Sequence, residues 1–304
     1  MKRLHALLLT TALLAGAGAA LPVLAARQND TLHEERSLYR NIFVTQDGDE
    51  RCLLFRARRG LGRESCKLMS NPDRLVFEYA QMMLSGLYAN PSPKRILVIG
   101  LGGATLPSAL QELVPDAKMD VVELDSAVDR VSRKYFDFKP TANTKVRIED
   151  GRVFVKRAGR AKQTYDLIML DAFESDYIPE HMLTREFLQE VKAIMAPKGV
   201  LVANTWSSSG LYDHESATYQ SVFGDFFNMK LDNRVILIRD GGLPDPAELR
   251  ANAQKFETEF VRRGTGLATL LPMMRVRKDW DAASRILTDQ YSPSNVLNAQ
   301  KRGG

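Results

Sequence analysis

The feature that most restricts the fold is a glycine-rich turn between two short apolar runs in residues 95–125. The first run, residues 96–99, is too short for a buried helix and stops at Gly100, which favours a fully buried parallel strand. Gly100, Gly102 and Gly103 then allow backbone angles that other residues resist, and they leave room for a ligand beside the main chain. Leucine spacing predicts a helix over 105–114, and residues 119–124 predict a second buried strand.

An acid completes this β-α-β unit. Glu123 ends the second strand, 21 positions after Gly102, a separation at which a carboxylate can accept hydrogen bonds from ribose hydroxyls. A glycine turn alone often serves only to pack a helix on a strand, but here the turn and the distal acid occur together. The turn lacks the full G-x-G-x-x-G spacing, so the sequence favours a mononucleoside cofactor such as S-adenosylmethionine over a dinucleotide.

Further strands are expected at 145–148, 165–171 and 200–204, followed by an antiparallel pair at 222–227 and 234–239. Asp150 and Asp171 stand at the ends of two of them. Ligands of open parallel sheets sit outside the carboxyl ends of the strands, so we expect the glycine turn, Glu123, Asp150 and Asp171 to converge on one crevice. The expected fold class is α/β, a mostly parallel sheet with terminal antiparallel strands.

A smaller β domain is expected before this sheet. The polar residues 26–40 are expected to be a loosely held lead-in. The turn at residues 46–49 then predicts a hairpin of 41–45 with 51–55, and a third strand is expected near 67–69. Helices are expected at 74–85, 127–135, 184–196 and 244–264, with another beginning at Arg152. The polar tail, residues 287–295, is expected to fold back over the cleft.

The first 25 residues have the layout of a secretory signal peptide, with two basic residues, an apolar stretch and small residues at 23–25. The sequence therefore predicts export, or a membrane anchor if this segment is not cleaved. The expected domains are 26–93, a β-hairpin domain with a gate helix, and 94–304, the nucleoside-binding domain. Cys52 and Cys66 either join as a disulfide or stay buried thiols, and they are too few for a four-thiolate zinc site.

Composition restricts the partners. The 304 residues are 44% hydrophobic, as in a globular protein with a sizeable core, and the formal net charge is +5. This small excess is no footprint of nucleic-acid binding. The expected partners are small molecules, and the sequence leaves a homodimer open.

Four segments together resemble the spermidine synthase family of aminopropyltransferases: residues 99–106 (IGLGGATL), 121–125 (VVELD), 149–152 (EDGR) and 165–171 (YDLIMLD). Three further segments resemble more closely a bacterial spermidine synthase-like branch: residues 171–179 (DAFESDYIP), 181–184 (HMLT) and 287–293 (LTDQYSP). The resemblance implies a Rossmann-like class I methyltransferase fold and a donor that is decarboxylated S-adenosylmethionine or a relative, with no metal. That donor is made in the cytoplasm, where an exported chain would not meet it.

The resemblance also implies roles for individual residues. Glu123 would hold the ribose, and Asp150, with Gly151 beside it, would hold the adenine. Asp171 would take a proton from the attacking amine, and Tyr79 would position that amine. The remaining expected substrate-binding residues are Glu174, Asp176 and Gln81.

Two departures from the family's motifs weaken the prediction that the donor is decarboxylated S-adenosylmethionine. The family's glycine turn is one residue longer and carries an aspartate, whereas Ala104 follows the glycines here, and Gln81 replaces an acid two positions after Tyr79. Three hypotheses follow: an aminopropyltransferase, a methyltransferase that uses intact S-adenosylmethionine, and a protein that binds a polyamine or nucleoside without turnover.

Overall fold

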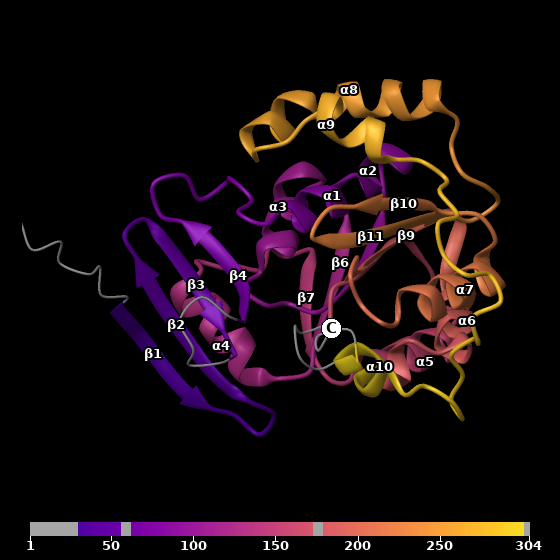
Figure 1. Cartoon of the computed structure of the whole chain (residues 1–304). Coiled ribbons are helices and arrows are strands. Elements are labelled where there is room, and N and C mark those ends of the chain that lie inside the picture. Colours follow the sequence, from indigo (N-terminus) through magenta and orange to yellow (C-terminus); the bar gives the residue numbers. More distant parts are fainter. Residues whose placement is uncertain (1–29, 56–61, 173–178, 301–304) are drawn as a thin grey trace, which may run out of the picture.

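The structure is a computed structural model that describes residues 30–55, 62–172 and 179–300. It contains two sheets, which Figure 1 shows side by side. The first is antiparallel, with its four strands in chain order: β1 (Asp30–Arg36), β2 (Asn41–Asp47), β3 (Glu50–Leu54) and β4 (Arg63–Leu68). The hairpin predicted over 41–55 is confirmed.

This sheet includes part of the N-terminal lead-in and both cysteines. Residues 30–36 were expected to be loosely held, but they form β1, which pairs antiparallel with β2. The side chains of β1 are mostly exposed, so the strand has no apolar alternation that a sequence pattern could reveal. Cys52 and Cys66 lie opposite each other on β3 and β4 and are joined as a disulfide.

The second sheet has seven strands in the order β10-β11-β9-β8-β5-β6-β7. The five strands from β9 to β7 are parallel, whereas β11 pairs antiparallel with both β9 and β10. The predicted fold class is therefore confirmed. The strands are β5 (Arg95–Ile99), β6 (Lys118–Glu123), β7 (Thr144–Ile148), β8 (Tyr165–Leu170), β9 (Met195–Trp206), β10 (Phe227–Lys230) and β11 (Asn233–Arg239).

Helices cover both faces of this sheet, which explains why its central strands are apolar on both sides. Ile96 and Val98 belong to one hydrophobic cluster, and Leu97 and Ile99 to the other. The first cluster includes side chains of α1 (Glu78–Leu84), α2 (Gly86–Ala89), α3 (Thr105–Leu113), α4 (Ser126–Tyr135), α8 (Pro246–Arg262) and α9 (Leu267–Leu270). The second includes those of α5 (Gly151–Arg160), α6 (Arg185–Ala193) and α7 (Tyr212–Phe223). The short 3-10 helices are η1 (Glu180–Met182) and η2 (Leu271–Met273).

Two expected elements start well after their predicted first residue. The helix predicted at 74–85 starts only at Glu78. The strand predicted at 222–227 starts only at Phe227, because α7 extends to Phe223 and ends at Gly224 with φ of +77°. The sequence did not reveal α7, since buried polar side chains interrupt its apolar pattern.

The tail, residues 287–295, does not line the cleft. It contacts the segment around η1, which does line the cleft. Asp289 accepts hydrogen bonds from both terminal nitrogens of Arg152, at 2.6 and 2.7 Å, and from the Thr184 hydroxyl at 2.7 Å. Ser292 donates to the carbonyl oxygen of Glu180, in η1, at 2.9 Å. The described residues end in α10 (Ser294–Gln300). These contacts fix η1 beside the carboxyl ends of the parallel strands.

Candidate active site

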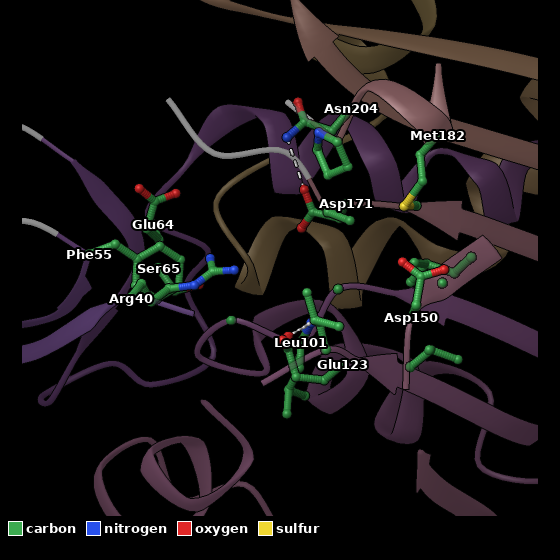
Figure 2. A pocket seen from close by; sticks show the side chains of 18 of the residues that line it. Arg40, Phe55, Glu64, Ser65, Leu101, Glu123, Asp150, Asp171, Met182 and Asn204 are labelled. Atoms are coloured by element: carbon green, nitrogen blue, oxygen red, sulfur yellow. Dashed lines mark hydrogen bonds between the residues drawn. The ribbon is translucent and has the colours of Figure 1, made fainter. Parts of the chain in front are cut away.

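A cavity opens at the carboxyl ends of β5, β6, β7, β8 and β9, between the two sheets. Side chains from both sheets point toward it (Figure 2). The residues of the large sheet and of η1 that line it include Gly100, Leu101, Gly102, Glu123, Asp150, Gly151, Asp171, Pro179, His181, Met182, Asn204, Trp206 and Asn233. The expected convergence of the strand-end acids is therefore present.

The glycine turn brings β5 and β8 together beneath this cavity. Gly100 has φ of +101°, and a Cβ there would lie 2.1 Å from the carbonyl oxygen of Asp171. Any other residue would push the two strand ends apart. The turn is also tied to the first sheet, because the N–H of Gly103 donates to the Ser65 hydroxyl oxygen at 2.9 Å.

Glu123 is held by the backbone on two sides. Its Oε2 accepts from the N–H of Leu101 at 3.0 Å and its Oε1 from the N–H of Asp125 at 2.9 Å. Burial raises the pKa of Glu123 above its ordinary value, although these two hydrogen bonds and the Arg40 guanidinium oppose the rise. Each carboxylate oxygen can accept more than one hydrogen bond, so the fixed side chain can still bind a hydroxyl pair.

Asp150 follows β7, the strand next to the one that ends in Glu123, and lies at the start of α5. Its Oδ1 accepts from the N–H of Val153 at 2.9 Å as the cap of that helix, and its Oδ2 lies 2.9 Å from Nε2 of His181. A Cβ on the adjacent Gly151 would lie 2.6 Å from the side chain of Ile99. Glycine thus lets α5 start close to β5 and keeps the Asp150 carboxylate at the cavity.

Asp171 follows β8 and lines the same cavity. Its Oδ1 accepts from Nδ2 of Asn204 at 2.9 Å. Burial raises the pKa of Asp171 to about 7, and the hydrogen bond from Asn204 limits the rise. Burial, together with the nearby carboxylates of Asp171 and Glu64, raises the pKa of Tyr79 well above its ordinary value. A carboxyl group that titrates near neutral pH therefore lies near a phenol that keeps its proton.

The first sheet and α1 supply the remaining wall. Arg40, Phe55, Glu64, Ser65 and Tyr79 all line the cavity. The Arg40 guanidinium lies 4.4 Å from the centre of the Phe55 ring, which is within the range of a cation-π contact. Figure 2 shows Arg40 and Phe55 on the side of the cavity away from Asp150.

Not every expected residue lies at this cavity. Gly103 lines a neighbouring hollow. Gln81 is not among the lining residues, because its Nε2 donates to the carbonyl oxygen of Leu75 at 2.9 Å. Glu174 and Asp176 lie outside the described residues.

The sequence reasoning missed several residues of the site. Asn204 ends a predicted strand, so the strand-end argument that found Asp171 also applies to it. Arg40, Phe55 and Ser65 gave no comparable signal, because they reach the cavity only through the packing of one sheet on the other.

Comparisons with known proteins agree with this architecture. Residues 76–240 match the spermine/spermidine synthase domain. Across 89% of the chain, the sequence is 47% identical to a polyamine aminopropyltransferase of Vibrio vulnificus, and the match covers 92% of that protein.

The chain belongs to the spermine/spermidine synthase family. Solved structures have the same fold. A probable spermidine synthase of Corynebacterium glutamicum superposes with a TM-score of 0.63 at 21% identity, over 84% of this chain and 98% of that one. Human methyltransferase-like protein 13 in complex with SAH gives a TM-score of 0.54 at 26% identity, over 68% of this chain and 96% of that one.

The predicted localisation was wrong. Export, or an anchor in a membrane, conflicted with the resemblance to spermidine synthases, and the 47% identity to a polyamine aminopropyltransferase decides that conflict against export. Residues 1–25 lie outside the described residues. In the part of the chain that the structure describes, no helix combines the length and the apolar character needed to cross a bilayer.

Proposed function

We propose that this spermidine synthase-like chain transfers an aminopropyl group from decarboxylated S-adenosylmethionine to an amine. The observation that carries the proposal is the position of Asp171, a half-buried carboxylate that lines the same cavity as Glu123, Asp150 and Tyr79. The relationship to the Vibrio vulnificus polyamine aminopropyltransferase supports it.

In this reaction Glu123 holds the ribose hydroxyls and Asp150 the adenine amino group, while the glycine turn of Gly100 and Gly102 lies against the nucleoside. A sulfonium donor so held presents the carbon next to sulfur toward Asp171. The proposed division of the chain assigns this nucleoside site to residues 94–304 and the cover over the amine to residues 26–93, with Tyr79 on the gate helix.

The chemistry requires a base. An alkylammonium ion has a pKa of about 10, so the amine must lose a proton before or during the attack of its nitrogen on carbon. As the new C–N bond forms, the C–S bond breaks, methylthioadenosine leaves as a neutral thioether, and Asp171 accepts the proton. The Tyr79 hydroxyl keeps its proton and orients the amine, while Glu174 and Asp176 are the expected carboxylates for further positive charge on a polyamine.

A product assay tests the proposal. Incubation of the full chain with decarboxylated S-adenosylmethionine and putrescine should release methylthioadenosine and form spermidine. The rate should rise with pH through about 7, because only ionised Asp171 can accept the proton. Asp171→Asn should abolish transfer and leave the affinity for methylthioadenosine little changed.

Two other results would contradict the proposal. Release of S-adenosylhomocysteine from intact S-adenosylmethionine, with no reaction of the decarboxylated donor, would indicate a methyltransferase. Binding of putrescine or methylthioadenosine without turnover of either donor with an amine would indicate a binding protein.

A further inference from the structure

Two asparagine side chains, Asn204 and Asn233, form a hydrogen-bonded row that ends on Asp171. Nδ2 of Asn204 donates to Oδ1 of Asp171 at 2.9 Å, and Nδ2 of Asn233 donates to Oδ1 of Asn204 at 3.0 Å. We call Asn204 and Asn233 the asparagine pair. Asn204 lies on β9 and Asn233 begins the neighbouring antiparallel strand β11, so the backbone fixes both ends of the contact between them.

The direction of each amide follows from chemistry. An ionised carboxylate only accepts hydrogen bonds, so Asn204 must turn its NH2 group toward Asp171. Its carbonyl oxygen then faces Asn233, which must donate. A reversed Asn204 amide would place an oxygen against the carboxylate and stabilise the protonated acid instead. Asn204 is only 6% exposed, so water has little access with which to compensate for a reversal.

We propose that Asn233 is a positioning residue, which holds the Asn204 amide with its NH2 group toward Asp171 and so keeps the base ionised and aimed at the amine. The role of Asp171 as base rests on the proposed function. The orientation of the asparagine pair and its effect on the titration of Asp171 do not.

Other charged or titratable groups face the same cavity and must be kept constant in any test. They come from the β1–β2 turn, β4, α1, β6, the connection from β7 to α5, and η1, and they are Arg40, Arg63, Glu64, Tyr79, Glu123, Glu149, Asp150 and His181. Substitution of Asn233 removes none of them. A changed titration of Asp171 in an uncharged Asn233 variant therefore reports on the asparagine pair.

The test compares wild type with Asn233→Leu, which has a similar volume and no hydrogen-bonding group. Infrared difference spectra against Asp171→Asn follow the Asp171 carboxyl directly, and the pH dependence of methylthioadenosine release follows it through turnover. The midpoint of the infrared titration and the midpoint of the pH–rate profile should each rise by about one pH unit. This is the size expected for one weakened hydrogen bond to a charge. The rate at pH 7 should then fall about fivefold, with the affinity for methylthioadenosine unchanged.

Three further variants sharpen the test. Asn233→Ala is also uncharged and has no hydrogen-bonding side chain, so it should shift the midpoints in the same direction as Asn233→Leu; this variant also covers the case in which Asn233→Leu does not fold. In an Asn204→Leu background, Asn233→Leu should add no shift, because the proposed effect passes through Asn204. Asp232→Asn, at an exposed position next to Asn233, should leave both midpoints in place.

An unchanged infrared midpoint in both Asn233 variants would overturn the proposal. A shift that persists in full in the Asn204→Leu background would also overturn it, since Asn233 would then act on Asp171 by another route. Failure of the wild type to transfer an aminopropyl group would contradict the proposed function alone, because the infrared titration measures Asp171 without turnover.

Discussion

Burial of the Asp171 carboxylate should lower the stability of the folded protein at neutral pH, and Asp171→Asn should restore it. The pKa of Asp171 is about 7 in the folded protein and 3.8 for the ordinary side chain, because the group is buried. One pKa unit corresponds to about 1.4 kcal/mol. Ionisation of Asp171 in place therefore costs about 4 kcal/mol of the free energy of unfolding.

The sign follows from proton binding. Between about pH 4 and pH 7 the folded protein keeps a proton on Asp171 that the unfolded chain has released, so the free energy of unfolding falls as the pH rises through this window. Asparagine is neutral throughout. The stability of Asp171→Asn relative to wild type should therefore increase by about 4 kcal/mol from pH 4 to pH 8. Glu123 and Glu215, whose pKa values burial also raises, are present in both proteins and cancel in the difference.

Urea unfolding followed by circular dichroism at several pH values measures this difference. Asp232→Asn is the matched control, because Asp232 is exposed on the turn between β10 and β11; its stability relative to wild type should not change over the same pH range. Parallel pH dependences for wild type and Asp171→Asn would refute the reasoning, since they would show that folding does not perturb this carboxyl.

Three other substitutions test the construction of the site. Glu123→Ala should weaken binding of methylthioadenosine by about 1–3 kcal/mol in calorimetry, because the ribose loses a charged acceptor, and equal affinity would contradict its role. Gly100→Ala should abolish transfer and lower the melting temperature, because its Cβ would lie 2.1 Å from the Asp171 carbonyl oxygen; full activity would contradict the close approach. Arg152→Leu should expose the tail to limited proteolysis, because the bidentate contact with Asp289 is lost, and unchanged cleavage would show that this contact does not hold the tail.

Local sequence signals predicted much of the fold and part of the site. The apolar runs before Gly100, Glu123 and Asp171 are short and end at glycine or acid, so they identify both the strands and the crevice at their ends. The polar strand β1 could not be predicted in this way, because its side chains are mostly exposed and only its backbone pairs with β2.

The rest of the site depends on packing between segments distant in the sequence. Arg40 and Phe55 reach the cavity because the first sheet lies against the carboxyl ends of the second, as the bond between Gly103 and Ser65 illustrates. Asn233 reaches Asn204 because β11 returns antiparallel beside β9. Neither segment has a periodic sequence pattern from which these contacts could be predicted.

The central claim is that acids at the ends of neighbouring strands hold one nucleoside with an amine above it. A crystal structure of the full chain with methylthioadenosine and putrescine tests it most directly. The account predicts the ribose hydroxyls on Glu123, the adenine amino group on Asp150, and a putrescine nitrogen within hydrogen-bonding distance of Asp171. A nucleoside bound elsewhere, or an amine that does not reach Asp171, would contradict it.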